Sequence, residues 1–168
     1  MNERRKLINW MAGVTTFIVV LLIVIVLLDR EEDGVSLAAA SRTVALTLES
    51  GNGILENAPE TSNFDEDLSD QWYVKYMDYL YGQGYLDSGS VKADERSATS
   101  AVTYAVLSDW AKKASEEGKG ETDALLSYVD SGDRAKKAVS SENFWKFYDA
   151  FRAAVDPDRA VAEVETDL

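Results

Sequence analysis

The feature that most constrains this chain is an uncharged apolar segment near its N-terminus, residues 8–28. It ends in FIVVLLIVIVLL, and its expected lipid contacts include Ile8, Trp10, Phe17 and Leu28. At about 1.5 Å per residue, a helix of this length covers the hydrocarbon core of a bilayer, which is about 30 Å thick. A buried helix of a soluble protein would carry a polar stripe, whereas the polar residues of this segment lie close to its start. We therefore expect a transmembrane helix.

Charges on either side of the span predict its orientation. Arg4, Arg5 and Lys6 precede it, and the acidic run DREED follows it. The positive-inside rule then places residues 1–7 in the cytoplasm. The chain is expected to be a single-pass protein of the plasma membrane, with an acidic linker over residues 29–34 and an extracytoplasmic domain over residues 35–168.

A cleaved signal peptide ending near SLAAAS is the alternative to a retained anchor. The apolar run is longer than the core of an ordinary signal peptide, and five charged residues separate it from the alanines. These two features favour the anchor.

Charge and composition exclude several classes of function. The net charge of -13 combines +2 before the span with -15 beyond it, so the outer part of the chain repels phosphate backbones, and we expect no nucleic-acid partner. The chain has no cysteine and no histidine. Disulfides, thiol nucleophiles, imidazole bases and the usual zinc sites are thereby excluded, and we expect no metal and no cofactor.

Helical periodicity dominates the outer part of the chain, and no window alternates with the two-residue period of a strand. The sequence therefore predicts a mainly α domain. The expected elements are a helix of about fourteen residues capped by Ser36, a loop over residues 49–63, helices near residues 70–81 and 103–114, a more polar helical stretch at 122–130, and a helix over 141–155 capped by Ser140 or Ser141.

Two segments repeat a pattern at their helix starts. VSLAAASRTVA from Val35 matches VTYAVLSDWAK from Val102, with Ser36 and Thr103 at equivalent cap positions. Matched caps about 67 residues apart suggest duplicated helical hairpins. Chance similarity between short helices is the alternative.

One stretch resembles a known bacterial repeat. Phe64-Asp65, Trp72, Tyr76-Met77, Leu80 and Gly84-Tyr85-Leu86 follow the order F-x-D, H-W-A, Y-I, L and G-I-I, except that Asp65 follows the phenylalanine directly. VTYAVLS from Val102 follows at the place of I-T-R-A-E-F-A. This order resembles the S-layer homology repeat over about fifty residues, with partial copies on either side. The resemblance implies a helical-hairpin scaffold, an envelope of the Gram-positive type, and binding to cell-wall polysaccharide.

The sequence departs from that repeat where the family holds its glycan. Tyr104 and Val106 stand at the positions of the family's arginine and glutamate, and Leu37 and Ala39 do so in the earlier copy. An anionic glycan needs a cation with matched donors. The resemblance therefore supports the scaffold more directly than the ligand.

Other candidate sites are weak. The run DEDLSD begins like a calcium loop, but Asp70 stands where glycine is required and Tyr76 where a bidentate glutamate should close the loop. Abundant acids make any carboxylate pair uninformative, and Lys75 and Lys92, the lysines that could replace histidine as a base, lie among polar neighbours. We expect no catalytic residue and no metal ligand.

Aromatic residues are the remaining signal. The helix near residues 70–81 carries more of them than one buried face can hold, so some are expected to be exposed and to bind a sugar ring or a protein. The alternative is that they wrap the core of a small domain. The candidate ligand contacts are Trp72, Tyr76 and Tyr79, with Trp110 and Trp145 on neighbouring hairpins.

The sequence thus predicts a membrane-anchored, noncatalytic module of the cell envelope that binds cell-wall polysaccharide or a protein partner. Two alternatives remain open: the anchor and adaptor part of a peptidoglycan-remodelling enzyme, and a subunit of an envelope assembly complex. The ending DPDRAVAEVETDL has no clear helix stop, which suits a chain that continues. The span has Gly13 but no pair of small residues at four-residue spacing along its run of Leu, Ile and Val, which favours plain anchoring over helix association in the membrane.

Overall fold

The computed structural model describes residues 34–49 and 51–156, which belong to one compact unit. The predicted transmembrane helix, with Ile8, Trp10, Phe17 and Leu28, lies outside the described residues. Within 34–49 and 51–156, no helix combines the length and the apolar character that a membrane span requires. The anchor therefore stays a prediction.

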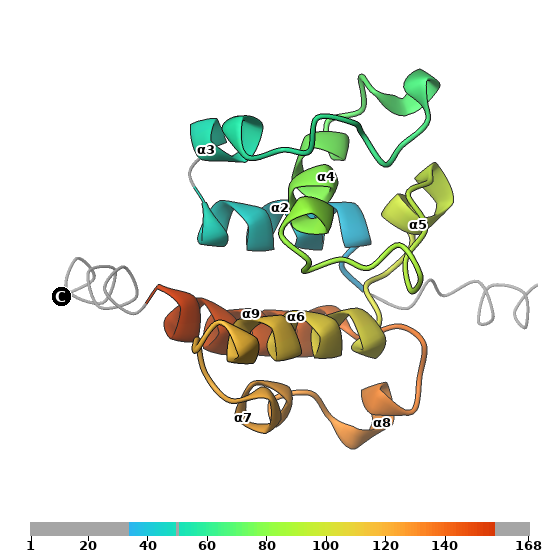
Figure 1. The fold of residues 1–168 in the computed structure, drawn as a ribbon. Coiled ribbons are helices and arrows are strands. Elements are labelled where there is room, and N and C mark those ends of the chain that lie inside the picture. Colours follow the sequence, from blue (N-terminus) through green and yellow to red (C-terminus); the bar gives the residue numbers. More distant parts are fainter. Residues whose placement is uncertain (1–33, 50, 157–168) are drawn as a thin grey trace, which may run out of the picture. The chain divides into compact units, whose positions relative to one another are not determined.

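The described residues are mainly helical, as the sequence predicts, and their β structure is confined to two isolated bridges (Figure 1). The elements in chain order are α2 (Leu37–Leu48), α3 (Gly51–Glu56), the 3-10 helix η1 (Glu66–Leu68), α4 (Val74–Gly82), α5 (Glu95–Thr99), α6 (Tyr104–Glu116), α7 (Thr122–Leu126), α8 (Ser131–Arg134) and α9 (Ser141–Val155).

The three longest of these helices, α2, α6 and α9, begin in the same way. Ser36, Thr103 and Ser140 precede them, and each side-chain oxygen accepts a hydrogen bond from the backbone N–H three residues on. A hydroxyl at this position satisfies a donor that the first turn leaves unpaired. The predicted caps are confirmed, and Ser140 rather than Ser141 caps the last helix.

Backbone hydrogen bonds join the segments that directly precede these three helices. The Val102 N–H donates to the Val35 carbonyl at 2.8 Å, and the Val139 N–H donates to the Val102 carbonyl at 2.9 Å. The helices that follow run in the same direction from this common edge (Figure 1). The two segments with matched caps therefore lie side by side, as duplicated hairpins would, and a third start joins them.

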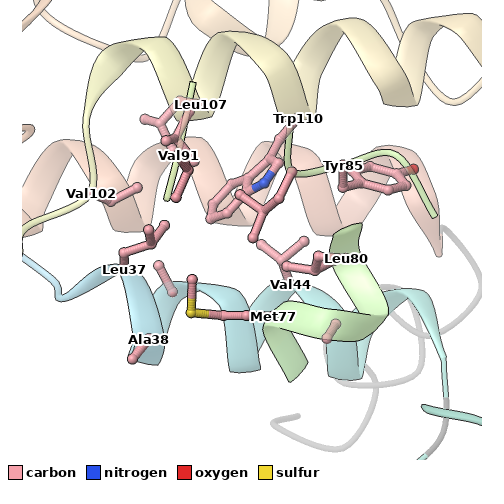
Figure 2. Packing of buried hydrophobic residues seen from close by; sticks show 14 of the residues in the cluster. Leu37, Ala38, Val44, Met77, Leu80, Tyr85, Val91, Val102, Leu107 and Trp110 are labelled. Carbon is pink, nitrogen blue, oxygen red and sulfur yellow. The ribbon is translucent and has the colours of Figure 1, made fainter. Parts of the chain in front are cut away.

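The core forms where these helices meet α4. Trp110 of α6 is fully buried, and it points toward Val44 of α2 and Leu80 of α4 (Figure 2). Tyr85, which follows α4, packs its ring edge to face against Phe151 of α9, with the centroids 6.3 Å apart. One apolar cluster thus connects α2, α4, α6 and α9.

A glycine turn ends α4, as predicted. Gly84 has a φ of +76°, in the left-handed region that residues with a side chain seldom adopt. The N–H groups of Tyr85 and Leu86 both donate to the Leu80 carbonyl, and the two side chains are buried.

Three of the predicted boundaries were wrong. Within the predicted loop at residues 49–63, α3 forms because Ile54 buries its side chain, and this packing outweighs the low helix propensity of the glycines. Helix α4 begins at Val74 rather than near residue 70, since the preceding turns place Tyr73 against Phe64 with ring centroids 5.8 Å apart. The polar stretch at 122–130 is helical only as far as Leu126.

Candidate functional site

A groove with a volume of about 410 Å³ runs between α2 and α9. This volume lies in the range of ordinary ligand sites. Helix α2 lines one side, α9 lines the other, and Trp72 projects from the turns before α4. The lining side chains are Ala39, Arg42, Thr43, Leu46 and Thr47 from α2, Tyr148 and Arg152 from α9, and Trp72.

Helical spacing explains why α2 presents these residues together. Ala39, Arg42, Thr43, Leu46 and Thr47 recur at intervals of three and four, which places them on one face of the helix. The opposite face is buried, and the six buried residues of α2 include none of these five. One face of α2 therefore builds the core while the other lines the groove.

A chain of hydrogen bonds joins the two sides of the groove. The Thr43 hydroxyl donates to the Ala39 carbonyl, and the Thr47 hydroxyl donates to the Thr43 carbonyl, each at 2.9 Å. The Tyr148 hydroxyl lies 2.8 Å from the Thr47 hydroxyl. Because Thr47 already uses its proton, Tyr148 is the donor in this pair. All three hydroxyl protons are thus committed within the protein.

Two guanidinium groups give the groove its charge. Arg42 is exposed on α2, and Arg152 is partly buried on α9. Arg42 also lies over the Tyr76 ring, 5.9 Å from the centroid, which favours one placement of the cation. Arginine suits the binding of carboxylate and phosphate groups because its planar fork offers paired donors. The groove is a cationic surface on a chain with a net charge of -13.

Three of the predicted contact residues lie at or beside this groove. Trp72 lines it and is 51% exposed. Trp145 is 45% exposed on α9, and its ring centroid lies 5.7 Å from that of Tyr148. Tyr76 is partly buried beside Arg42. Residues from separate predicted hairpins are thus brought to one surface.

The other two predicted contacts belong to the core. Trp110 is 0% exposed and Tyr79 is 5% exposed, so a surface ligand cannot reach either of them. Burial, followed by the neighbouring charges of Glu49 and Glu117, raises the pKa of Tyr79. Both residues lie on the inward faces of their helices, and their selection as ligand contacts was wrong for this reason.

Sequence reasoning missed Arg42, Leu46 and Arg152. The spacing of Arg42 and Leu46 on a predicted helix was available as a signal, since it sets them apart from the apolar face. No local signal indicates that Arg152 joins them. It lies 110 positions after Arg42 in the sequence and reaches the groove only because α9 packs against α2.

The remaining polar clusters serve the fold. The Asp133 carboxylate of α8 is buried beside the start of α9, where it accepts hydrogen bonds from Ser140 and Asn143. Asp78 likewise holds the loop at Ser62 and Asn63. Across residues 34–49 and 51–156, no group of three or more His, Cys, Asp or Glu side chains is arranged to hold a metal ion.

The fold and the groove define a small, mainly helical domain with an open aromatic and cationic surface. Neither a family model, nor a curated protein, nor a solved structure matches the chain. The resemblance to S-layer homology repeats therefore stays a prediction.

Proposed function

We propose that this chain is a membrane-anchored, noncatalytic module of the cell envelope that binds its ligand in the groove between α2 and α9. The ligand is cell-wall polysaccharide or a protein partner outside the membrane. The uncharged span over residues 8–28, with basic residues before it and acidic residues after it, supports the anchoring.

The observation that carries the proposal is the exposure of Trp72 beside Arg42 and Arg152. A half-exposed tryptophan stabilises a small domain less than the same side chain would if it were fully buried in the core. Aromatic and arginine side chains are also the types that dominate binding energy at contact surfaces. Their presence together in a groove supports binding rather than packing as their role.

Cosedimentation tests the proposal. Residues 30–168 are mixed with native cell envelopes, with intact walls, and with walls stripped of secondary polymer. We expect the fragment to sediment with the envelopes and the Trp72→Ala variant to be retained at least about tenfold less, because a central aromatic contact contributes about 2 kcal/mol or more. The matched control is Tyr128→Ala, which removes an equally exposed aromatic side chain that does not line the groove.

Three results would contradict the proposal. Equal retention of both variants would remove the groove from the binding surface. Cleavage of muramyl bonds by the fragment alone would show that the module is catalytic. Failure of a protease added to whole cells to digest residues 35–168 would place the domain on the wrong side of the membrane.

A further inference from the structure

Short helices of the chain already cover two sides of the core. Helix α4 packs against α2, and α7 packs against both α6 and α9, where Leu125 and Leu126 are buried (Figure 1). Among the described residues, the groove is lined by side chains of α2 and α9 and by Trp72. It is thus a place on this core where a further helix can lie between two others.

Apolar side chains gather at this place. Among the described residues, five large hydrophobic side chains are exposed, and Leu46 and Trp72 line the groove, while Trp145 contacts Tyr148 at its side. Exposed apolar groups that cluster in this way mark a contact surface. An occupant of the groove should therefore present apolar side chains of its own.

The charges in the groove indicate which charged residues a ligand should carry beside its apolar surface. Arg42 and Arg152 stand on opposite sides, one on each helix, and no Asp or Glu is among the lining residues. A carboxylate on the occupant can pair with the exposed guanidinium of Arg42, whereas a lysine or arginine would be repelled. The matching ligand is acidic beside its apolar surface.

Hydrogen bonding distinguishes a protein from a polysaccharide here. Each sugar hydroxyl is a donor that needs an acceptor, and the side-chain acceptors that line the groove are the hydroxyl oxygens of Thr43, Thr47 and Tyr148, with no carboxylate or amide oxygen beside them. Leu46 offers no acceptor at all. A helix, in contrast, satisfies its interior backbone groups itself and presents only side chains to the groove. The groove is therefore better matched to a helix than to a sugar.

We propose that the groove binds an acidic amphipathic helix of another envelope protein, with its apolar face on Leu46 and Trp72 and a carboxylate on Arg42. This inference rests on the proposed function, because it names the ligand of the same site. In the proposed complex, α2 and α9 pack against the partner's helix, as α2 already packs against α4 and α9 against α7.

Photocrosslinking of the full-length protein in the cells that produce it tests this assignment. A benzophenone amino acid replaces Leu46 in one variant and Leu55 in the control, since Leu55 is 61% exposed and does not line the groove. We expect a protein adduct from position 46 and none from position 55. Sequencing of the crosslinked segment should show apolar residues at helical spacing with Asp or Glu beside them.

Charge variants complete the test. Arg42→Glu should lower the adduct yield about tenfold, whereas the exposed Lys137→Glu should leave it unchanged. Lysine in place of the contacting carboxylate of the partner should restore the yield with Arg42→Glu. An adduct that is insensitive to Arg42→Glu, or a segment without acidic residues, would overturn the inference.

Two further outcomes separate this inference from the proposed function. An adduct with wall polysaccharide at position 46 would overturn the helix and leave the envelope-binding function intact. No adduct of either kind, together with no retention by envelopes, would overturn both.

Discussion

The carboxylate of Asp133 gives the sharpest prediction about how the groove is held. Its Oδ2 atom accepts from the Ser140 N–H at 3.0 Å, the Ser140 hydroxyl at 2.8 Å and the Asn143 side-chain amide at 2.6 Å. These residues form the start of α9, which carries Tyr148 and Arg152 to the groove. Removing the carboxylate should therefore loosen one side of the binding surface.

The structure separates two substitutions by magnitude. Asp133→Ala leaves three donors without their acceptor, and we expect a loss of about 3 kcal/mol in the free energy of unfolding. Asp133→Asn can place its amide oxygen where Oδ2 lies, so it keeps an acceptor and loses only the charge. Because bonds to charged groups exceed neutral ones by about 1 kcal/mol, we expect a loss of about that size.

The pH dependence has a definite sign. Burial acts to raise the pKa of Asp133, but hydrogen bonds from Asn143 and Ser140, with a smaller effect of Lys136, outweigh it, so the pKa is lowered. A carboxyl whose pKa is lower in the folded state stabilises the protein above its unfolded pKa of about 3.9, and this contribution is lost as the pH falls through the folded pKa. The difference between the wild-type protein and Asp133→Asn should therefore shrink below about pH 4.

Urea unfolding of residues 34–168 from pH 3 to pH 7, followed by circular dichroism, measures both effects. A loss below about 0.5 kcal/mol for Asp133→Ala would refute the reasoning, since exposed sites away from such networks give changes of that size. A difference between wild type and Asp133→Asn that grows toward low pH would also refute it.

Four further substitutions test the core, the groove and the turns by the same unfolding assay. Trp110→Ala should cost about 3–5 kcal/mol because it empties a fully buried site, whereas Trp72→Ala should cost about 1 kcal/mol because that side chain is half exposed; equal effects would mean that the groove is part of the core. Gly84→Ala should cost about 1–2 kcal/mol, since its φ of +76° is unfavourable for a residue with a Cβ, and a neutral result would contradict this turn geometry. Asp78→Ala should cost about 2 kcal/mol through the lost bonds to Ser62 and its neighbour, and hydrogen exchange should rise first in that loop; uniform exchange would count against its local role.

Local signals predicted the parts of this fold that depend on neighbouring residues. Ser36 and Thr103 cap helices because a hydroxyl there bonds within its own turn, and Gly84 reverses the chain because glycine alone tolerates a positive φ easily. Such features need no knowledge of the rest of the molecule. They also indicated the paired starts of α2 and α6.

Long-range packing decided the rest. Ile54 turns a glycine-rich loop into a helix only because a core lies beneath it, and Trp110 is buried because α2 and α4 close over α6. Arg42 and Arg152 meet at one groove although neither position carries a signal of the other. The sequence could therefore indicate that aromatic residues form a site, but not which of them remain outside or which cations join them.

The central claim is that the groove between α2 and α9 is the contact surface of this chain in the envelope. The most direct test compares the retention of two double variants by native envelopes: Arg42→Glu with Leu46→Glu in the groove, and Lys137→Glu with Leu55→Glu outside it. Both change the charge equally and replace one exposed leucine. We predict at least about a tenfold loss of retention for the groove variant and none for the other, with equal helical content. Equal retention of the two variants, or equal loss, would contradict the account.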